Sequence, residues 1–504
     1  MGVIIMKTKK IDLGLWKKNR IKEDEIKRYK KEGQGSFIDH KKIEFLLAKK
    51  RKISKKEIKD ILAKSLTIEA LSLEETAVLL SVEDKELLSL MEETAYKIKR
   101  NVYDNRIVTF APLYLGNFCV NDCLYCGFRE SNKNACRKVL SRDEIISDTK
   151  VLAGKIGHKR LIVVYGEHPK NDVDYIEKSI KAIYSVKEKT KNGFGQIRRV
   201  NVNAPPFAID DLKKLHEVGI GTYQVFQETY HPETYRKVHP QNTIKGNYDW
   251  RLYCMHRAFE AGIDDLGIGV LFGLYDWKFE LMGLVAHAHE LENKFGVGPH
   301  TISFPRLEPA DSSPYTQNSK FKVSDKDFRR LITVIRLAVP YTGMIITARE
   351  TPQIREDSLT LGVTQTDASS RIGIGGYSKA TQTQESNRQQ FLLGDTRSLD
   401  EVVRKFSEMG FITSFCTAGY RCGRTGKCIM DLLKKGEEGK FCKLNAVLTF
   451  REWLDDFATP ETKRAGELVI KKEIQEVKTR NPKIYEQFIN FYDRIKRGER
   501  DLYF

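Results

Sequence analysis

The sequence predicts an α/β fold, a (β/α)8 barrel of the TIM type over residues 105–380 with mostly helical extensions at both ends. Three observations predict it. Apolar strand-like runs alternate with amphipathic helix-like runs from residue 108, which is typical of a parallel sheet. Eight such strands can be counted, the number that closes a barrel. The 504 residues are enough for a barrel with additions at both ends. The expected strands span residues 108–115, 160–167, 198–205, 222–229, 265–273, 300–308, 343–349 and 365–376.

Two segments precede the barrel. Residues 1–36 are rich in lysine and close with the loop signal Gly33-Gln-Gly-Ser36, so we expect a peripheral basic arm. Residues 37–104 have a helical pattern throughout, and capping boxes at residues 54–57 and 72–75 mark two helix starts. This part is expected to be a helical N-terminal extension without a site of its own.

Three cysteines stand in the loop after the first expected strand. Cys119, Cys123 and Cys126 have the spacing C-x3-C-x2-C. Three thiolates in one tight loop indicate a metal site, and a cubane iron–sulfur cluster held by three cysteines keeps one iron open to a small molecule. The alternative is a zinc site, for which Cys136 is near enough to be a fourth ligand. The short window directly after a strand favours the cluster.

Polar side chains also fall where other expected strands end. Gly166 and Glu167 end the second strand, Glu228 lies at the end of the fourth, and Arg349 ends the seventh. The loops after the carboxyl ends of barrel strands build the active site, so we expect these residues to join the cysteine loop. Each residue taken alone is equally well explained as an ordinary polar group at a strand end.

After residue 380 the alternation of strands and helices stops. Residues 381–504 are expected to form a mostly helical C-terminal extension. It carries a second group of cysteines at positions 416, 422, 428 and 442.

Composition excludes some classes of protein. No stretch reaches about 18 apolar residues, so we expect no membrane span. The nine cysteines are odd in number and lie in metal-like spacings, which argues for a reducing compartment, with the cytoplasm as the expected location. The net charge of +18 raises the question of a nucleic-acid partner. Lysines are spread among acidic residues along helices, which favours solvated helix faces instead.

These motifs resemble those of the radical S-adenosylmethionine (SAM) enzymes, whose [4Fe–4S] cluster is held by this cysteine spacing. Further runs resemble the aromatic amino acid lyase branch of these enzymes. That branch contains the 2-iminoacetate synthases of thiazole biosynthesis (ThiH type) and the tyrosine lyases that mature FeFe-hydrogenases (HydG type). The resemblance covers about residues 38–500, and the runs that carry it are residues 166–170, 223–231, 267–276 and 296–303.

The resemblance implies a reaction and roles for the strand-end residues. In such enzymes a SAM-derived radical takes a hydrogen from tyrosine, and the Cα–Cβ bond breaks to give p-cresol and dehydroglycine. Gly166 and Glu167 would meet the SAM amine, and Glu228 would accept from the ribose hydroxyls. Arg257 would meet the SAM carboxylate. Arg349 is the candidate for the tyrosine carboxylate, because a guanidinium binds a carboxylate bidentately. For both arginines a structural salt bridge is the alternative.

The C-terminal cysteines bear on the choice between the two families. Hydrogenase maturases of this type carry a C-x2-C-x22-C extension that holds a second cluster, on which dehydroglycine is broken down to CO and cyanide. Cys416 and Cys442 match its outer positions, whereas Gly419 stands at the middle one. Cys422 is the candidate substitute as third ligand. His287 matches a histidine that holds a labile iron in the maturases. An intact and a degenerate second Fe–S cluster both remain open.

We therefore expect a tyrosine lyase of the hydrogenase-maturase type that uses a [4Fe–4S] cluster and SAM. Its partners would be tyrosine, an electron donor such as flavodoxin or ferredoxin, and a hydrogenase maturation scaffold. The first alternative is a 2-iminoacetate synthase for thiamine thiazole biosynthesis. A distant alternative is a basic zinc protein that binds nucleic acid.

Overall fold

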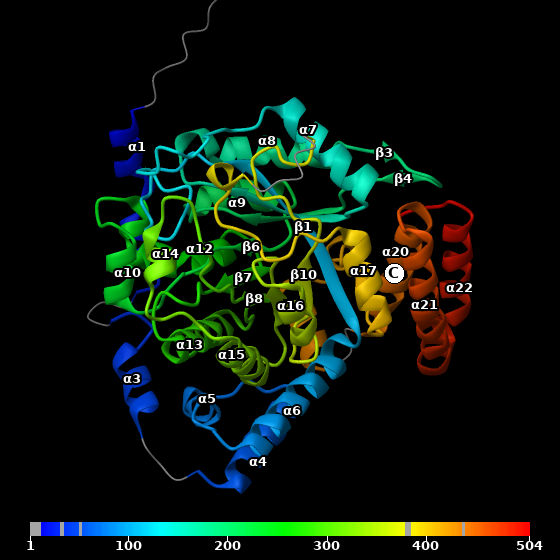
Figure 1. Cartoon of the computed structure of the whole chain (residues 1–504), viewed down its shortest axis with the longest axis horizontal. Coiled ribbons are helices and arrows are strands. Elements are labelled where there is room, and N and C mark those ends of the chain that lie inside the picture. The colour runs from blue at the N-terminus through cyan, green and yellow to red at the C-terminus, as the bar shows by residue number, and fades with distance from the viewer. Residues whose placement is uncertain (1–11, 31–34, 50–52, 379–384, 436–438) are drawn as a thin grey trace, which may run out of the picture.

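A closed parallel barrel forms the centre of the computed structural model, which describes residues 12–30, 35–49, 53–378, 385–435 and 439–504 (Figure 1). Its eight strands run in chain order around the barrel, and the last pairs with the first. The predicted (β/α)8 architecture is confirmed. The strands are β1 (Arg106–Gly116), β2 (Arg160–Tyr165), β5 (Arg199–Asn203), β6 (Tyr223–Gln224), β7 (Leu266–Gly269), β8 (Thr301–Ser303), β9 (Gly343–Ile346) and β10 (Gln365–Asp367).

All eight strands lie where the sequence predicts them, but most are shorter than expected. The clearest case is β6, which has two residues where residues 222–229 were expected. Beyond it the chain stays buried, and the N–H groups of Val225 and Gln227 still donate to Gly267 and Gly269 of the β7 strand. The apolar pattern of the sequence indicates which residues are buried, and the buried residues continue past the last regularly paired residue of the strand. The expected strand is therefore longer than the observed one.

Helices surround the barrel and follow most of its strands. After β1 a regular helix continues into a π-helical turn, η1 (Val151–Ile156). A two-stranded hairpin of β3 (Glu188–Lys189) and β4 (Phe194–Gly195) was not expected from the sequence. The helices of this region are α7 (Arg142–Lys150), α8 (Val173–Tyr184), α9 (Ile209–Glu217), α10 (Pro232–Val238), α11 (Tyr248–Leu252), α12 (Cys254–Glu260), α13 (Trp277–Phe295), α14 (Pro314–Asn318), α15 (Asp325–Ala338), α16 (Pro352–Ser358) and α17 (Leu399–Glu408).

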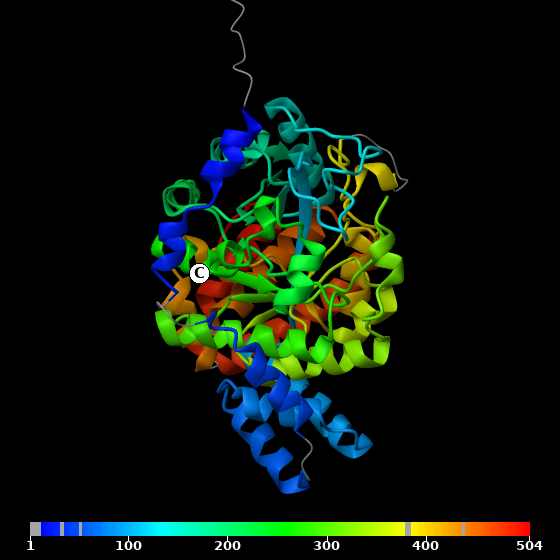
Figure 2. The same cartoon turned by 90° about the vertical axis from the view of Figure 1, so that its left-hand side faces the viewer.

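The N-terminal extension packs against the outside of the barrel. The helices α3 (His40–Ala48), α4 (Lys55–Leu66), α5 (Leu73–Leu80) and α6 (Lys85–Tyr103) form the blue group at the bottom of Figure 2. Ser54 and Ser72 cap α4 and α5, as the sequence predicts. Two short helices, α1 (Leu13–Arg20) and α2 (Glu23–Lys27), lie higher on the side of the barrel.

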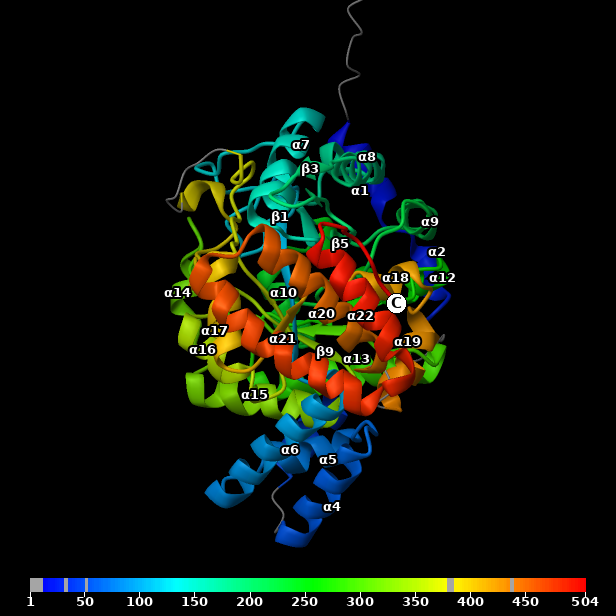
Figure 3. The ribbon, with the colours of Figure 1, turned by 90° about the vertical axis from the view of Figure 1, so that its right-hand side faces the viewer.

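The C-terminal extension adds a strand and helices on the side of the barrel that faces the viewer in Figure 3. Strand β11 (Ile412–Ser414) pairs in parallel with the first residues of β1, at Arg106–Val108. The helices α18 (Ala418–Arg421), α19 (Gly426–Lys434), α20 (Gly439–Asp456), α21 (Pro460–Arg480) and α22 (Pro482–Lys496) follow it.

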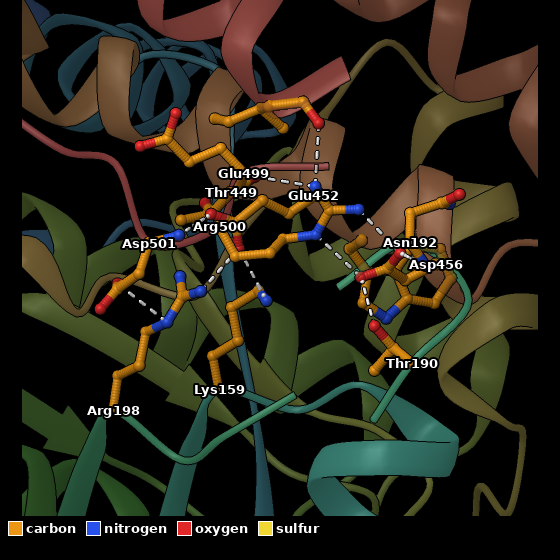
Figure 4. A network of polar contacts seen from close by, with 12 residues as sticks. Lys159, Thr190, Asn192, Arg198, Thr449, Glu452, Asp456, Glu499, Arg500 and Asp501 are labelled. Carbon is orange, nitrogen blue, oxygen red and sulfur yellow. Dashed lines mark hydrogen bonds and ion pairs between the residues drawn. The ribbon is translucent and has the colours of Figure 1, made fainter. Parts of the chain in front are cut away.

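A buried ionic network fastens this extension to the barrel (Figure 4). Glu452 of α20 is fully buried, and its carboxylate lies 2.9 Å from the Lys159 ammonium and 2.7 Å from the Arg198 guanidinium. Lys159 and Arg198 stand just before β2 and β5. Arg198 also pairs with Asp501, whose N–H donates to Glu452 at 2.7 Å. The network therefore joins α20 and the last residues of the chain to the amino-terminal end of two barrel strands.

Among the described residues, each helix is too short or too polar to cross a lipid bilayer.

Candidate active site

The three cysteines after β1 line one cavity at the carboxyl end of the barrel strands. Cys119, Cys123 and Cys126 share its wall with side chains from the ends of β2, β6 and β9. The Val120 N–H donates to the Glu167 carbonyl at 2.8 Å and ties the loop to the end of β2. The fold therefore presents three thiols to a single interior space. Cys136, the candidate fourth zinc ligand, is exposed and does not line this cavity.

Glu228 enters the cavity from the turn after β6. Its backbone has φ of 71°, a left-handed conformation that costs on the order of 1–3 kcal/mol for a residue other than glycine. Burial alone would raise the pKa of the Glu228 carboxyl, but Lys245 and Arg251 outweigh it and the pKa is lowered. The ammonium of Lys245 is 2.8 Å and the guanidinium of Arg251 is 3.3 Å from Oε1. Glu228 is thus held as a carboxylate.

A second buried carboxyl keeps this turn in place. Glu280, at the start of α13, accepts hydrogen bonds from the Thr229 hydroxyl and, at 2.7 Å, from the Tyr230 N–H. Burial raises the pKa of Glu280 to about 8. The contacts hold the two residues after Glu228 and so stabilise its strained backbone conformation.

Gly166 and Glu167 directly follow β2 beside the cysteine loop and line the same cavity. A Cβ at Gly166 would overlap the carbonyl oxygen of Phe118, so only glycine lets the two segments approach this closely. Glu167 is buried, and its Oε2 accepts a hydrogen bond from the Asn121 amide at 2.6 Å.

Arg349 follows β9 and lines the cavity from the other side. Its guanidinium carbon lies 3.2 Å from the ring centroid of Phe391, a cation–π contact. Burial lowers the pKa of the Arg349 guanidinium, and the Glu228 carboxylate is among the groups that oppose this shift. Within the part of the chain that the structure describes, no protein acceptor forms a hydrogen bond with this guanidinium. Its donors are available to an anionic ligand.

The donor set of this cavity fits an iron–sulfur cluster with a ligand on its open iron. Three thiols come from one loop, and carboxylates and guanidinium groups lie within the same enclosure. Among the described residues, no three cysteine, histidine or acidic side chains converge as the ligands of a single metal ion would. A cluster spreads its three cysteine ligands over three iron atoms, so it does not require that convergence.

Comparisons with known proteins agree with this geometry. Residues 113–283 match the model of the radical SAM superfamily, and residues 303–412 match the Biotin and Thiamin Synthesis associated domain. A crystal structure of HydG, a maturase of the [FeFe]-hydrogenase, is 47% identical, with a TM-score of 0.87 over 93% of this chain and 100% of that chain. HydG from Carboxydothermus hydrogenoformans is 38% identical, with a TM-score of 0.74 over 91% of this chain and 97% of that chain. The chain is a radical SAM enzyme of the HydG family.

Another relative matches a smaller part of this HydG-family chain. The 2-iminoacetate synthase of Escherichia coli (strain K12) is 28% identical over 349 residues, which are 69% of this chain and 87% of that protein. The radical SAM family uses a [4Fe–4S] cluster and SAM. In this HydG-family protein, Cys119, Cys123 and Cys126 are the residues that would hold that cluster.

Arg257 does not line the cavity of this HydG-family enzyme, contrary to the sequence prediction. It lies on the inner face of α12, where its guanidinium donates to the carbonyls of Phe207 and Trp250 at 3.0 and 2.6 Å and stacks 3.6 Å from the Trp250 ring. The arginine that lines the cavity is Arg251, on the preceding helix α11. Sequence spacing alone does not indicate which of two neighbouring helical arginines points inward.

The second cysteine group is on the opposite side of the barrel, near the amino ends of the strands. Cys416 follows β11, has φ of 46° and lies beside the Arg160 guanidinium. Cys422 directly follows α18, is exposed, and donates to the Phe504 carbonyl oxygen at 3.6 Å. Cys442 is half-buried on α20. Gly419 supplies no side chain, so the described geometry does not complete a three-thiol set like that of the first loop.

His287 lies away from these C-terminal cysteines, against the prediction that it holds a labile iron. It is buried in α13, where its Nδ1 is 2.8 Å from the Tyr230 hydroxyl and its ring packs against Phe37. His300 lies instead in the polar group near Cys416. Its Nε2 is 4.0 Å from Asp265, a residue that interacts with Tyr420 of α18. His300 is not among the predicted site residues because it precedes β8, whereas most of the predicted residues lie where strands end.

Proposed function

We propose that this HydG-family enzyme is a tyrosine lyase, which cleaves the Cα–Cβ bond of tyrosine to p-cresol and dehydroglycine. In the hydrogenase-maturation pathway dehydroglycine is the precursor of CO and cyanide. One observation carries the proposal. Arg349 lines the cavity that the three cysteines line, and among the residues that the structure describes no protein acceptor forms a hydrogen bond with its guanidinium.

The cavity suits both ends of an aromatic amino acid. The Arg349 guanidinium supplies paired donors for a carboxylate, in a buried setting where such a pair is strong. Deeper in the barrel the wall is apolar, where Phe110, Ile162 and Ile345 pack together. An aromatic ring placed there would be removed from water while its amino acid group stays near Arg349.

The residues around the cysteine loop suit the polar groups of SAM. A cluster with SAM bound supplies a 5′-deoxyadenosyl radical, which abstracts hydrogen. Glu167 offers a carboxylate oxygen to the SAM ammonium, and Glu228 is held ionised to accept from the ribose hydroxyls. Arg251, in place of Arg257, is the arginine in reach of the SAM carboxylate, because it lines the cavity beside Glu228.

Two observations favour the hydrogenase-type pathway over thiazole synthesis. The HydG structures match 91–93% of this chain, whereas the 2-iminoacetate synthase matches 69%. The C-terminal extension also carries Cys416 and Cys442, which match the outer positions of the cysteine motif in the maturases. Gly419 argues the other way, since it removes one thiol from that extension. The proposal therefore assigns tyrosine cleavage to the first site and assigns no step to a second cluster.

The test is a product ratio measured without oxygen. Reconstituted protein receives SAM, dithionite and tyrosine; p-cresol is measured by chromatography, and CO is trapped by reduced haemoglobin. We expect p-cresol from the native chain and none from Cys123→Ala. Absence of p-cresol from protein with a full first cluster would refute the lyase assignment.

The ratio also selects the pathway. CO in amounts comparable to p-cresol would support hydrogenase maturation, with a maturation scaffold as partner. p-Cresol without CO would favour the 2-iminoacetate synthase alternative. Replacing dithionite by reduced flavodoxin or ferredoxin tests the proposed electron donor in the same assay.

A further inference from the structure

The N-terminal segment, residues 12–30, is fastened along the side of the barrel next to the active-site cavity. It is the dark blue stretch beside the green barrel helices in Figure 2. Glu25 accepts from the Ile209 N–H at the start of α9, at 3.1 Å. Arg28 pairs with Glu260 at 2.6 Å, and a further lysine–aspartate pair joins the segment to α11. The basic arm expected from the sequence to be peripheral is thus attached to the helices that enclose the site.

Arg20, the last residue of α1, points into the protein. Only 9% of its side chain is exposed, although most of α1 lies on the surface. Its Nη2 donates to the Pro206 carbonyl at 2.7 Å, and its guanidinium stacks 4.2 Å from the Phe207 ring. Two carboxylates face it: its Nη1 is 3.5 Å from Asp211, and its Nε is 3.5 Å from Oε1 of Glu167.

The contact with Glu167 links this segment to the active site. Glu167 is 4% exposed, lines the cysteine cavity, and also lines a second cavity together with Arg20. Its two oxygens have different surroundings. Oε2 accepts from Asn121 of the cysteine loop, whereas Oε1 has no hydrogen-bond donor in the described protein. At 3.5 Å the Arg20 Nε is too far for a good hydrogen bond but close enough for strong attraction in a buried setting.

Arg20 compensates the charge of the Glu167 carboxylate without forming a hydrogen bond to its Oε1. A buried carboxylate without a nearby cation is costly, and Arg20 provides the compensating charge from the side away from the cavity. Oε1 keeps the capacity to accept from a primary ammonium, a charge-assisted hydrogen bond that is stronger than a neutral one. Arg20 is itself fixed by Pro206 and Phe207, so the carboxylate has a fixed neighbour.

We propose that Arg20 is a positioning residue for SAM. From the N-terminal segment, it holds the Glu167 carboxylate in place to accept a hydrogen bond from the SAM ammonium. This rests on the proposed role of Glu167. Arg20 touches neither SAM nor tyrosine; it acts through Glu167. The N-terminal segment is therefore part of the SAM site, although its sequence has no motif for it.

A double-mutant cycle on SAM binding tests this. Equilibrium binding of labelled SAM to reconstituted protein is measured without tyrosine, for the native chain, Arg20→Gln, Glu167→Gln and the double variant. We expect Arg20→Gln to weaken SAM binding about tenfold in the native background and less than about twofold when Glu167 is already glutamine, because the two residues act as one unit. Arg20→Lys should recover part of the loss.

The matched control is Arg28→Gln, which removes an arginine of the same segment whose side chain is about half exposed. It should leave SAM binding unchanged. A general loss of the segment's attachment would weaken binding in both variants and would overturn the proposal. Equal loss from Arg20→Gln in both backgrounds would also overturn it, as would no loss at all. If Arg20→Gln does not fold, the same cycle is run with Arg20→Lys, for which a two- to threefold effect confined to the native background is expected.

Failure of this inference differs from failure of the proposed function. SAM binding needs no tyrosine, so a chain that makes no p-cresol can still show the coupling between Arg20 and Glu167. Conversely, if the chain forms p-cresol and substitution of Arg20 leaves its SAM affinity unchanged, only the positioning role is refuted.

Discussion

We expect the replacement of Glu452 by glutamine to destabilise the packing of the C-terminal extension against the barrel. The carboxylate is fully buried and is shared by the Lys159 ammonium at 2.9 Å and the Arg198 guanidinium at 2.7 Å. Glutamine keeps the shape of the side chain and its hydrogen-bonding oxygen, but it removes the charge. Two buried cations then lose the anion that lies between them (Figure 4).

Two arguments give the magnitude. Burial alone would raise the pKa of Glu452, but Arg198 and Lys159 outweigh it and lower the pKa from 4.5 to about 2. At ~1.36 kcal/mol for each pKa unit, this lowering corresponds to roughly 3 kcal/mol of stability. Breaking a buried ion pair by removing one partner costs about 3–5 kcal/mol. We expect Glu452→Gln to lower the free energy of unfolding by about 3–4 kcal/mol at neutral pH.

The same pKa fixes the pH dependence. A carboxyl whose pKa is depressed in the folded state stabilises the fold above its unfolded pKa, and this contribution is lost as pH falls through the folded pKa. The difference between the native chain and Glu452→Gln should therefore be complete above about pH 4.5 and shrink toward pH 2.

Urea unfolding followed by circular dichroism under anaerobic conditions measures both effects. Glu461→Gln on α21 is the matched control, because its ion pair with Arg464 is more than half exposed on both sides. It should change the free energy of unfolding by less than about 0.5 kcal/mol. A loss below about 1 kcal/mol for Glu452→Gln, or a difference that does not shrink in acid, would refute the reasoning.

Three further changes test the two sites. Arg349→Lys keeps the charge but loses the paired donors, so the KM for tyrosine should rise about tenfold or more while SAM binding is unchanged; an unchanged KM would contradict the role of Arg349. Gly166→Ala forces a Cβ against Phe118, so iron content and SAM affinity should fall, whereas Gly373→Ala, where an added Cβ meets one atom at 3.8 Å, should change neither. Gly419→Cys is unstrained, because the nearest atom to an added Cβ is 3.6 Å away. It should add up to about four irons per chain if a third thiol is what the second site lacks, and an unchanged iron count would refute that.

The sequence predicted the barrel well because the signal is local. Buried strands separated by amphipathic helices repeat eight times, and each repeat is visible within about 40 residues. Strand β11 was missed because its three residues carry no periodic pattern. It exists because β1 is long enough to pair with β2 near its end and with β11 near its start. Such a pairing depends on contacts about 300 residues apart in the chain, which a local pattern does not contain.

The candidate site was predictable where residues end strands. The ends of parallel strands in a barrel meet on one face, so Cys119, Glu167, Glu228 and Arg349 come together wherever the fold is right. Arginines on helices were not predictable in this way. Whether a helical side chain faces the cavity depends on how the helix is rotated against the barrel, and this rotation is set by tertiary packing.

The long strand β1 also separates the two cysteine groups. The first cysteine loop follows its last residue, Gly116, whereas Cys416 follows β11, whose Ser414 pairs with Val108. Eight residues of strand between Val108 and Gly116 span about 26 Å at ~3.3 Å per residue. The apolar side chains of Phe110 and its neighbours lie inside the barrel between these levels. A missing ligand at the second group therefore leaves the first site structurally untouched, so under the proposed function p-cresol would report on the first group whatever the state of the second.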